Sequence, residues 1–389
     1  MKAVEITIPS SKSLTNRAIV ISSLSSGTSK ISNVSNSLDS QLMIKAMKKL
    51  GVKIEKNKNI LKIIGNNGKF SKFEGSINVG NSGTVARFLT ALITLIPGRV
   101  IIKKSERMKV RPMKELNDAL KKIETGKVSI DGSVSSQFIT ALMMIAPVLD
   151  KGLEINITGR MISSSYIDMT IELMKKFGVK VEQIASNKFI VKKQQYRSTD
   201  CVVESDMSGA SYFFAVAAVT KKTIRIKNIN FKSSQGDLAF PDLLEKMGCQ
   251  IKKNIKEKWI EVAGPKVLKG IKVDMTNMPD TAQTLAVVAA FAKGRTKITG
   301  LSTLKVKETD RLLALKKELY KMKIKSEIAK DSIIIFGGNP QKTTIETYGD
   351  HRMAMAFAVA KLRVPGLIIK NPEVVKKSFP EFWKLFRKI

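Results

Sequence analysis

Chemically versatile side chains gather near the start of the sequence, in the run Pro9-Ser-Ser-Lys-Ser-Leu-Thr-Asn-Arg17. This run places the cations Lys12 and Arg17, together with several hydroxyls, directly before the apolar residues 18–21. Because proline and serine can precede and cap a helix, the pattern predicts a buried helix whose N-terminus offers cations, hydroxyls and unpaired backbone N–H groups. Such an end attracts anions. Taken alone, however, a basic loop with a helix cap explains the run more simply.

The rest of the chain favours the anion site, because the same arrangement occurs six times. Each copy has an apolar, small-residue segment typical of a helix buried on nearly every side, followed by a turn and an alternating strand. The predicted buried helices are residues 15–24, 84–96, 136–148, 210–220, 281–292 and 352–362, and the strands after them are residues 28–34, 99–103, 153–158, 223–229, 296–301 and 366–370. A charged, amphipathic helix follows in every copy, at residues 41–50, 114–122, 169–177, 241–247, 311–322 and 382–387.

These elements predict an α/β protein in two domains of three repeats each. The repeat is a strand, a buried helix, a strand, an exposed helix and one or two further strands. One copy is shortened, because the next strand begins at Val128, soon after the exposed helix ends at Lys122. A chain of 389 residues is long enough for two such cores. We expect two crossings between the domains, which gives domain one residues 1–11 and 206–389 and domain two residues 12–205.

The composition restricts the function. The chain has 68 Lys and Arg against 33 Asp and Glu, a formal net charge of +35, which favours anionic partners. The lysines are spread along the chain, and an aromatic content of 6% is poor for stacking nucleic-acid bases, so only the charge supports a nucleic-acid-binding protein. One His and two Cys, Cys201 and Cys249, argue against a disulfide framework and a His/Cys metal site. Without a signal peptide or an apolar run near the ~20 residues of a membrane span, we expect a cytoplasmic protein.

Unusual polar residues precede or begin each buried helix. They are Lys12, Ser13 and Arg17; Gly80-Asn-Ser-Gly-Thr-Val-Ala-Arg87; Ser133-Val-Ser-Ser-Gln137; Asp206-Met-Ser-Gly-Ala-Ser211; Pro279-Asp280; and Gly349-Asp-His-Arg352. If the repeats stack alike, the helix N-termini of one domain point the same way, and six positive ends would line a cleft between two facing domains. Such a cleft suits one or more polyanions.

In order along the chain, these and further motifs closely resemble the 5-enolpyruvylshikimate-3-phosphate synthase family. The matching stretches are Ser11-Lys-Ser-Leu-Thr-Asn-Arg17, Gly80-Asn-Ser-Gly-Thr-Val-Ala-Arg87, Arg107-Met-Lys-Val-Arg-Pro112, Asp131-Gly-Ser-Val-Ser-Ser-Gln-Phe138, Ser165-Tyr-Ile-Asp168, Gln235-Gly-Asp237, Met278-Pro-Asp280, Val306-Lys-Glu-Thr-Asp-Arg311, Asp350-His-Arg-Met353 and Lys377-Ser-Phe-Pro380. The resemblance implies the two-domain inside-out α/β barrel of enolpyruvyl transferases, which agrees with the repeats.

The reaction that the resemblance implies moves the enolpyruvyl group of phosphoenolpyruvate onto the 5-hydroxyl of shikimate 3-phosphate. It passes through a tetrahedral ketal, releases phosphate, and lies on the shikimate pathway to chorismate and the aromatic amino acids. No metal or organic cofactor is implied. The implied partners are the two anionic substrates, with no specific nucleic acid and no membrane, and a monomer is expected. Domain closure on shikimate 3-phosphate is also expected, to exclude water from the intermediate.

The resemblance carries over site residues motif by motif. Those expected at shikimate 3-phosphate are Lys12, Ser13, Arg17, Ser135, Ser136, Gln137, Ser163, Tyr166, Asp280, Thr303 and Lys307. Those expected at phosphoenolpyruvate are Lys12, Gly83, Arg87, Arg111, Gln137, Arg311, Arg352 and Lys377. The catalytic candidates are Asp280 as general base for the 5-hydroxyl, Glu308 and Lys12 for the remaining proton transfers, and Lys377. Asp350 is expected to orient its neighbours.

A few positions depart from the family pattern. Thr303-Leu304 stands where many relatives have a longer polar or aromatic pair, Ser164-Ser165 replaces a common Lys-Pro, and Gly349 replaces a common Asn. Gly83 keeps the glycine of glyphosate-sensitive relatives, which predicts inhibition by glyphosate.

The nearest alternative is the sister family that enolpyruvylates UDP-N-acetylglucosamine. That family typically uses a loop cysteine as proton donor, whereas both cysteines here have structural positions. Cys201 lies in a predicted strand and Cys249 follows a glycine that ends a helix. The triplet Ser135-Ser-Gln137 also favours the shikimate substrate.

Overall fold

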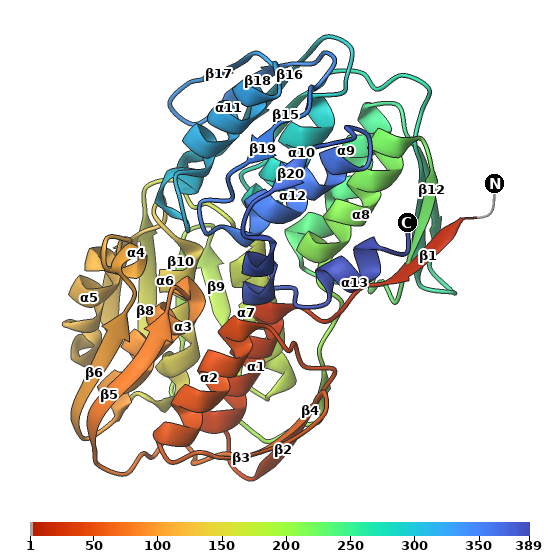
Figure 1. Cartoon of the computed structure of the whole chain (residues 1–389). Helices are drawn as coiled ribbons and strands as arrows, with labels where there is room; N and C mark the ends of the chain where they lie inside the picture. Colours follow the sequence, from red (N-terminus) through yellow and green to blue (C-terminus); the bar gives the residue numbers. More distant parts are fainter. Residues whose placement is uncertain (1–2) are drawn as a thin grey trace. The chain divides into compact units, whose positions relative to one another are not determined.

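The computed structural model describes residues 3–389, which form two compact domains (Figure 1). Domain one runs to Pro9 and resumes at Glu204, continuing to Ile389, and domain two is Ser10–Val203. The chain therefore crosses after Pro9 and after Val203, in each case two residues before the crossing expected from the sequence. Within residues 3–389, no helix is long and apolar enough to cross a membrane.

Domain two consists of three repeats. The first comprises β11 (Cys201–Val202), α1 (Lys12–Leu24), β2 (Thr28–Ser32), α2 (Leu38–Lys49), β3 (Lys53–Asn57) and β4 (Ile60–Ile64). The second comprises β5 (Phe73–Gly80), α3 (Gly83–Leu92), β6 (Gly98–Lys104), the short α4 (Glu106–Lys109) and α5 (Lys114–Leu120). The third comprises β7 (Lys127–Asp131), α6 (Ser136–Ile145), β8 (Leu153–Thr158), α7 (Ser165–Lys176), β9 (Glu182–Ala185) and β10 (Lys188–Val191).

Domain one repeats the same order. Its first repeat comprises β1 (Val4–Thr7), α8 (Met207–Thr220), β12 (Thr223–Lys227), α9 (Phe240–Lys246), β13 (Gln250–Asn254) and β14 (Trp259–Ala263). The second comprises β15 (Lys272–Asp274), α10 (Ala282–Ala289), β16 (Arg295–Thr299), α11 (Arg311–Lys321), β17 (Ser326–Ile328) and β18 (Ile333–Phe336). The third comprises β19 (Thr344–Ile345), α12 (His351–Lys361), β20 (Ile368–Ile369) and α13 (Phe382–Phe386). All twelve predicted helices are confirmed, with ends that differ by a few residues.

Apolar residues on every side place one helix of each repeat inside its domain. In α8, every residue from Met207 to Val219 is buried, and α8, α10 and α12 contact one another. In domain two, α3 contacts both α1 and α6. The sheets and the amphipathic helices lie outside these helices in each domain (Figure 1). Each domain thus has its own hydrophobic core, with helices at its centre and sheets around it.

Four repeats carry a four-stranded sheet of one pattern. Its first two strands are parallel, and the hairpin after the exposed helix adds antiparallel strands, which gives the orders β1-β12-β14-β13, β11-β2-β4-β3, β7-β8-β10-β9 and β15-β16-β18-β17. In the β1–β12 pair, Ile6 lies opposite Ile226, and both side chains are buried. Because β1 precedes the first crossing and β12 follows the second, this sheet joins the two segments of domain one.

Two repeats lack the hairpin. The predicted shortened copy has only the pair β5–β6, because β7 begins soon after α5. The sheet of the third repeat of domain one is also a pair, β19–β20, and α13 follows it. The first of these copies was predicted to be shortened and the second was not, because residues 382–387 complete the set of exposed helices there.

One backbone contact recurs where a hairpin ends on the buried helix. Gly65, Gly264 and Gly337 each directly follow the second strand of a hairpin, which is β4, β14 and β18 respectively. An added β-carbon would lie 2.2 Å from the Ser25 carbonyl oxygen at Gly65, 2.0 Å from that of Ala217 at Gly264 and 1.9 Å from that of Ala292 at Gly337. Only a residue without a side chain fits this approach, so the three glycines mark one structural position of the repeat.

Candidate active site

The N-terminus of α1 presents Lys12 in a fixed position. Ser11 caps the helix by accepting the N–H of Leu14. The Nζ atom of Lys12 lies 3.0 Å from Oδ2 of Asp39, in the first turn of α2, and the Lys12 side chain is 12% exposed. An ammonium group has three donors, so Lys12 can bind Asp39 and still meet an anion. Asp39 was not predicted, because a first-turn acid is common in helices.

Arg17, one turn further along α1, is fully buried. Its Nε donates to Oγ1 of Thr170 at 2.8 Å, its Nη1 to the Ser13 carbonyl at 3.0 Å, and its Nη2 to the Tyr166 carbonyl at 3.3 Å. Its guanidinium also lies 5.8 Å from the centre of the Tyr166 ring. Burial lowers the pKa of Arg17 to about 10. Arg17 therefore joins α1 to α7 and fixes two other predicted residues, Ser13 and Tyr166.

A second group of predicted residues meets at the N-terminus of α3. Nη1 of Arg87 donates to Oε1 of Gln137 at 2.7 Å, so this cation on α3 is oriented by α6. An added β-carbon on Gly83, the first residue of α3, would lie 2.6 Å from Nη2 of Arg111 and 2.9 Å from Nη1 of Arg87. The two guanidinium groups thus converge on the backbone of Gly83. Convergent cations beside a helix N-terminus suit a phosphate or a carboxylate.

The predicted serines lie at two other helix starts of domain two. Ser135 caps α6 by accepting the N–H of Gln137 at 3.3 Å, and Ser136 is the first residue of that helix. Ser163 precedes α7 in the left-handed conformation, with φ 54°, and its carbonyl accepts the N–H of Tyr166 at 3.1 Å. Since α6 and α7 contact each other, these hydroxyls belong to neighbouring helix ends.

In domain one, Arg311 is surrounded by carboxylates. Its Nε lies 2.7 Å from Asp350, its Nη1 3.2 Å from Asp280, and its Nη2 3.0 Å from Glu308. Burial lowers the pKa of Arg311, but Asp350, Glu308 and Asp280 outweigh burial and the net shift is upward. The guanidinium is therefore permanently charged and fixed from three sides, and Asp350 orients it as predicted.

Asp280 faces three cations. One oxygen lies 2.8 Å from Nη2 of Arg352, and the other lies 3.2 Å from Arg311 and 3.5 Å from Nζ of Lys307. Burial raises the pKa of Asp280, but Arg352, Lys307 and Arg311 outweigh burial and hold the pKa well below its ordinary value. Asp280 is consequently ionised at neutral pH, as a proton acceptor must be.

Glu308 connects two elements of domain one. It lies 3.0 Å from Nη2 of Arg311 and 2.9 Å from Nζ of Lys377, which ends the 3-10 turn Pro372–Lys377. Thr303 is buried in another 3-10 turn, Ser302–Val306, where its hydroxyl has no hydrogen-bond partner among the described residues. The structure thus brings Glu308 and Lys377 together and leaves Thr303 outside the ion-pair cluster.

The structure adds Asp237 and Ser208 beside Arg352. The hydroxyl of Ser208 donates to Asp237, and Nη2 of Arg352 lies 3.5 Å from the Ser208 oxygen. Burial raises the pKa of Asp237 to about 7, and the nearby charge of Asp280 adds to the rise. Neither was predicted as a site residue, although Ser208 lies in the polar stretch 206–211 at the start of a predicted buried helix and Asp237 lies in one of the stretches that carried the family resemblance.

The two domains cap their buried helices differently. The caps are Ser11, Ser82 and Ser135 in domain two, and Asp206 and Asp350 in domain one, where Asp280 also lies just before α10. A neutral cap leaves the partial positive charge of the helix end available, whereas a carboxylate compensates it. The helix ends of domain two are thus suited to receive anions, and those of domain one supply carboxylates that fix arginines.

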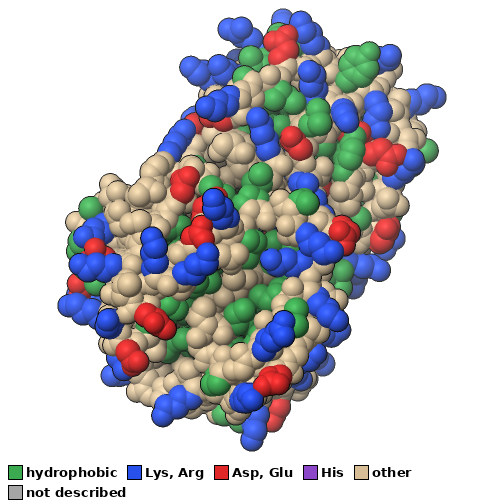
Figure 2. Space-filling model, turned by 90° about the vertical axis from the view of Figure 1, so that its left-hand side faces the viewer, with side chains coloured by type: hydrophobic (Ala, Val, Ile, Leu, Met, Phe, Trp, Pro, Cys, Tyr) green, Lys and Arg blue, Asp and Glu red, His purple; other side chains and the backbone are tan. Residues whose placement is uncertain are grey.

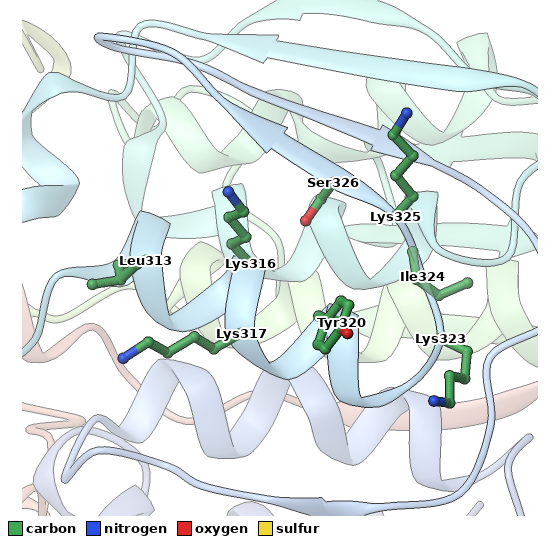
Figure 3. Close-up of a pocket in the computed structure, with 8 residues that line it drawn as sticks. All are labelled: Leu313, Lys316, Lys317, Tyr320, Lys323, Ile324, Lys325 and Ser326. Carbon is green, nitrogen blue, oxygen red and sulfur yellow. The ribbon is translucent and has the colours of Figure 1, made fainter.

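Many basic side chains lie on the surface outside these clusters. Figure 2 shows lysine and arginine side chains spread over the visible face, with acidic residues among them. A separate pocket of about 580 Å³ lies on the outer face of α11, where Lys316, Lys317 and Tyr320 line it, and it contains no predicted site residue (Figure 3). Among the described residues, no group of three or more His, Cys, Asp or Glu is placed to hold a metal ion.

Comparison with known proteins identifies the relatives of this chain. The sequence model of the EPSP synthase family (3-phosphoshikimate 1-carboxyvinyltransferase) matches residues 3–126 and 121–386. Proteins named 3-phosphoshikimate 1-carboxyvinyltransferase from Nostoc punctiforme and Sulfurovum sp. are 39% and 38% identical to the chain, over 98% and 99% of it and 95% and 96% of their own lengths.

Solved structures show the same fold. An EPSP synthase from Acinetobacter baumannii has a TM-score of 0.81 at 24% identity, over 99% of this chain and 95% of that one. The enolpyruvyl transferase NikO from Streptomyces tendae has a TM-score of 0.75 at 13% identity, over 100% of this chain and 94% of that one. These similarities confirm the predicted two-domain enolpyruvyl transferase fold.

Proposed function

We propose the following roles for the site residues on the premise that this chain belongs to the EPSP synthase family. The chain is a 3-phosphoshikimate 1-carboxyvinyltransferase of the shikimate pathway, and its substrates are phosphoenolpyruvate and shikimate 3-phosphate. The observation that supports the residue roles best is the convergence of Arg87 and Arg111 on Gly83, because it forms an anion site where the phosphoenolpyruvate motif was predicted.

Shikimate 3-phosphate is bound chiefly through domain two. The hydroxyls of Ser135, Ser136 and Ser163 contact its phosphate, and the N-terminus of α6, which Ser135 caps, adds N–H donors. Tyr166 and Ser13, which Arg17 holds in place, shape the rest of this site. Further contacts to this substrate come from Lys12, Gln137, Asp280, Thr303 and Lys307.

Phosphoenolpyruvate is bound by two groups of cations. Arg87 and Arg111, with the N–H of Gly83 and the side chains of Gln137 and Lys12, form one group, and Arg311, Arg352 and Lys377 form the other. Arginine suits this substrate because its planar fork matches carboxylate and phosphate oxygens. In domain one, Arg352 is held for this role by Asp280, Ser208 and Tyr212, which contact both of its terminal nitrogens.

Addition and elimination each involve two proton transfers. In addition, the 5-oxygen bonds to C2 of phosphoenolpyruvate, Asp280 accepts the hydroxyl proton, and the methylene carbon gains a proton from Glu308 or Lys12. In elimination, the C2–O bond to phosphate breaks, the new methyl group returns a proton to Glu308 or Lys12, and the departing phosphate gains a proton that balances the one taken by Asp280. Lys12 and Lys377 stabilise the negative charge that develops on the departing oxygens.

The substrates themselves would adjust the basicity of Asp280. Without substrate, three cations depress its pKa and make it a weak base. Once the phosphate and carboxylate of phosphoenolpyruvate neutralise Arg311 and Arg352, their hold on Asp280 weakens and its pKa rises toward the range useful for catalysis. Proton abstraction would then be favoured only when both substrates are present.

Phosphate release from the purified protein tests this assignment. Release should require both shikimate 3-phosphate and phosphoenolpyruvate and should be lost in Asp280→Ala and Glu308→Ala. Release with UDP-N-acetylglucosamine in place of shikimate 3-phosphate would instead indicate the sister reaction.

Three further properties are part of the proposal. The chain acts as a cytoplasmic monomer, it has no specific nucleic-acid or membrane partner, and glyphosate inhibits it. Light scattering measures the mass in solution. Binding to arbitrary DNA tighter than micromolar at physiological salt would contradict the second point, and a glyphosate inhibition constant no better than millimolar would contradict the third.

A further inference from the structure

Glu318 is a buried carboxylate that the reaction does not use. It lies on α11 and is fully buried. A buried charge is unfavourable unless it is paired, so its partners indicate its role. Its oxygens accept the Tyr348 hydroxyl at 2.6 Å and the Glu346 N–H at 3.0 Å, and one of them lies 2.5 Å from Nζ of Lys321.

Two of these partners belong to the loop of residues 346–350, between β19 and α12. This loop contains two consecutive left-handed residues, Tyr348 with φ 53° and Gly349 with φ 64°. Glycine adopts that conformation freely, whereas a residue as bulky as tyrosine adopts it only with support from its surroundings. Burial and the hydrogen bond to Glu318 raise the pKa of Tyr348, so its hydroxyl stays a donor at neutral pH. The hydrogen bond from this hydroxyl to Glu318 supports Tyr348 in its left-handed conformation.

The same helix holds the other end of this loop. Arg311 donates from Nε to Asp350 at 2.7 Å. Because Arg311 and Glu318 are seven residues apart, they lie two turns apart on one face of α11. Asp350 in turn caps α12 by accepting the N–H of Arg352 at 2.8 Å. The loop that leads to Asp350 and Arg352 is therefore attached to α11 at two points.

We propose that Glu318 is a positioning residue for phosphoenolpyruvate binding: it holds the 346–350 loop so that Asp350 orients Arg311 and Arg352. This inference rests on the proposed role of those arginines. Glu318 touches neither substrate, and it acts through Tyr348 and the Glu346 N–H. We call the two hydrogen bonds that Glu318 accepts, from the Tyr348 hydroxyl and the Glu346 N–H, the clamp. Without the clamp, the Tyr348 backbone relaxes, which moves Asp350 and misaligns the guanidinium groups of Arg311 and Arg352.

Steady-state kinetics of Tyr348→Phe and Glu318→Gln tests the clamp. Each variant should raise KM for phosphoenolpyruvate about tenfold, the usual effect of losing one hydrogen bond to a charged group, and should lower kcat. KM for shikimate 3-phosphate should stay within twofold, because its proposed phosphate contacts lie in domain two. The double variant should lose less than the sum of the two single ones, because both substitutions weaken the contact between Glu318 and Tyr348.

Matched controls come from the same part of the fold. Tyr320→Phe alters a tyrosine on the outer face of α11 (Figure 3), and Glu327→Gln alters an exposed carboxylate on β17. Both controls should behave like the unmodified enzyme.

An unchanged KM for phosphoenolpyruvate in both folded test variants would overturn the clamp. Equal losses of affinity for both substrates, together with a lower Tm, would also overturn it, because they would indicate a purely structural role. The unmodified enzyme is measured in the same series. If it does not turn over the two substrates, the assigned reaction is wrong; if it does and the test variants behave like it, only the clamp is wrong.

Discussion

Gly83 and Arg111 approach so closely that no β-carbon fits between them: it would lie 2.6 Å from Nη2 of Arg111. The helix N-terminus, its free N–H groups and the guanidinium therefore share one small space. This contact makes the absence of a side chain at position 83 a requirement of the anion site, since φ at Gly83 is not in the left-handed region.

Gly83→Ala should displace Arg111 and Arg87 and weaken phosphoenolpyruvate binding. We expect KM for phosphoenolpyruvate to rise about tenfold or more, because a charge-assisted hydrogen bond is lost, while KM for shikimate 3-phosphate changes little. Gly338→Ala is the control, because φ there is not in the left-handed region and an added β-carbon would meet only the Ile324 side chain, at 3.5 Å. An unchanged KM in Gly83→Ala would mean that the arginines do not act at this helix end.

Asp280→Asn should lower kcat at least about a hundredfold, as expected for loss of a general base. The amide keeps the shape of the side chain but removes the charge that faces Arg352, Arg311 and Lys307. Phosphoenolpyruvate affinity should be retained, because these cations lose a competing carboxylate. Asp310→Asn is a matched control, since Asp310 caps α11 and asparagine caps equally well. A kcat within tenfold of the unmodified enzyme would exclude Asp280 as the base.

Asp237→Asn should change the pH dependence of stability. The pKa of Asp237 rises from 3.8 to about 7 on folding. The folded state therefore keeps a proton that the unfolded state releases, and stability falls as pH rises from about 4 to about 7. Asparagine does not ionise, so the variant does not lose stability in this way. Its free energy of unfolding, relative to that of the unmodified enzyme, should therefore be roughly 2–4 kcal/mol more favourable at pH 8 than at pH 4.5. Denaturant unfolding at the two pH values measures the difference in the free energy of unfolding between the variant and the unmodified enzyme. The same difference at both pH values would show that the pKa of Asp237 is not raised in the folded protein.

Gly337→Ala should destabilise domain one by about 1–3 kcal/mol, because the added methyl meets the Ala292 carbonyl and overpacks the helix end. Gly338→Ala is the neighbouring control, where the nearest atom is a flexible Ile324 methyl at 3.5 Å. Thermal unfolding of the two variants compares them directly. A Tm equal to that of Gly338→Ala would show that the contact at Gly337 is easily relieved.

The local sequence pattern determined the repeats and their helices. Segments such as residues 210–220 are apolar on every side, and this composition is compatible only with a helix inside a core, so the elements follow from local physics. The shortened copy between α5 and β7 was visible for the same reason, since too few residues separate these two elements for a hairpin. The motifs around Lys12, Gly83 and Arg311 indicated an anion site because cations and helix starts are adjacent in the sequence.

The tertiary structure alone decided which charges pair. Arg352 meets Asp280 across 72 positions, Arg311 meets Asp350 across 39, and Lys12 meets Asp39 across 27. Periodicity reports which face of an element is buried, but the packing of one repeat against another decides which side chains meet there. For the same reason, an acid such as Glu318, ordinary on an amphipathic helix, gained its partners in the 346–350 loop only when α11 packed against the start of α12.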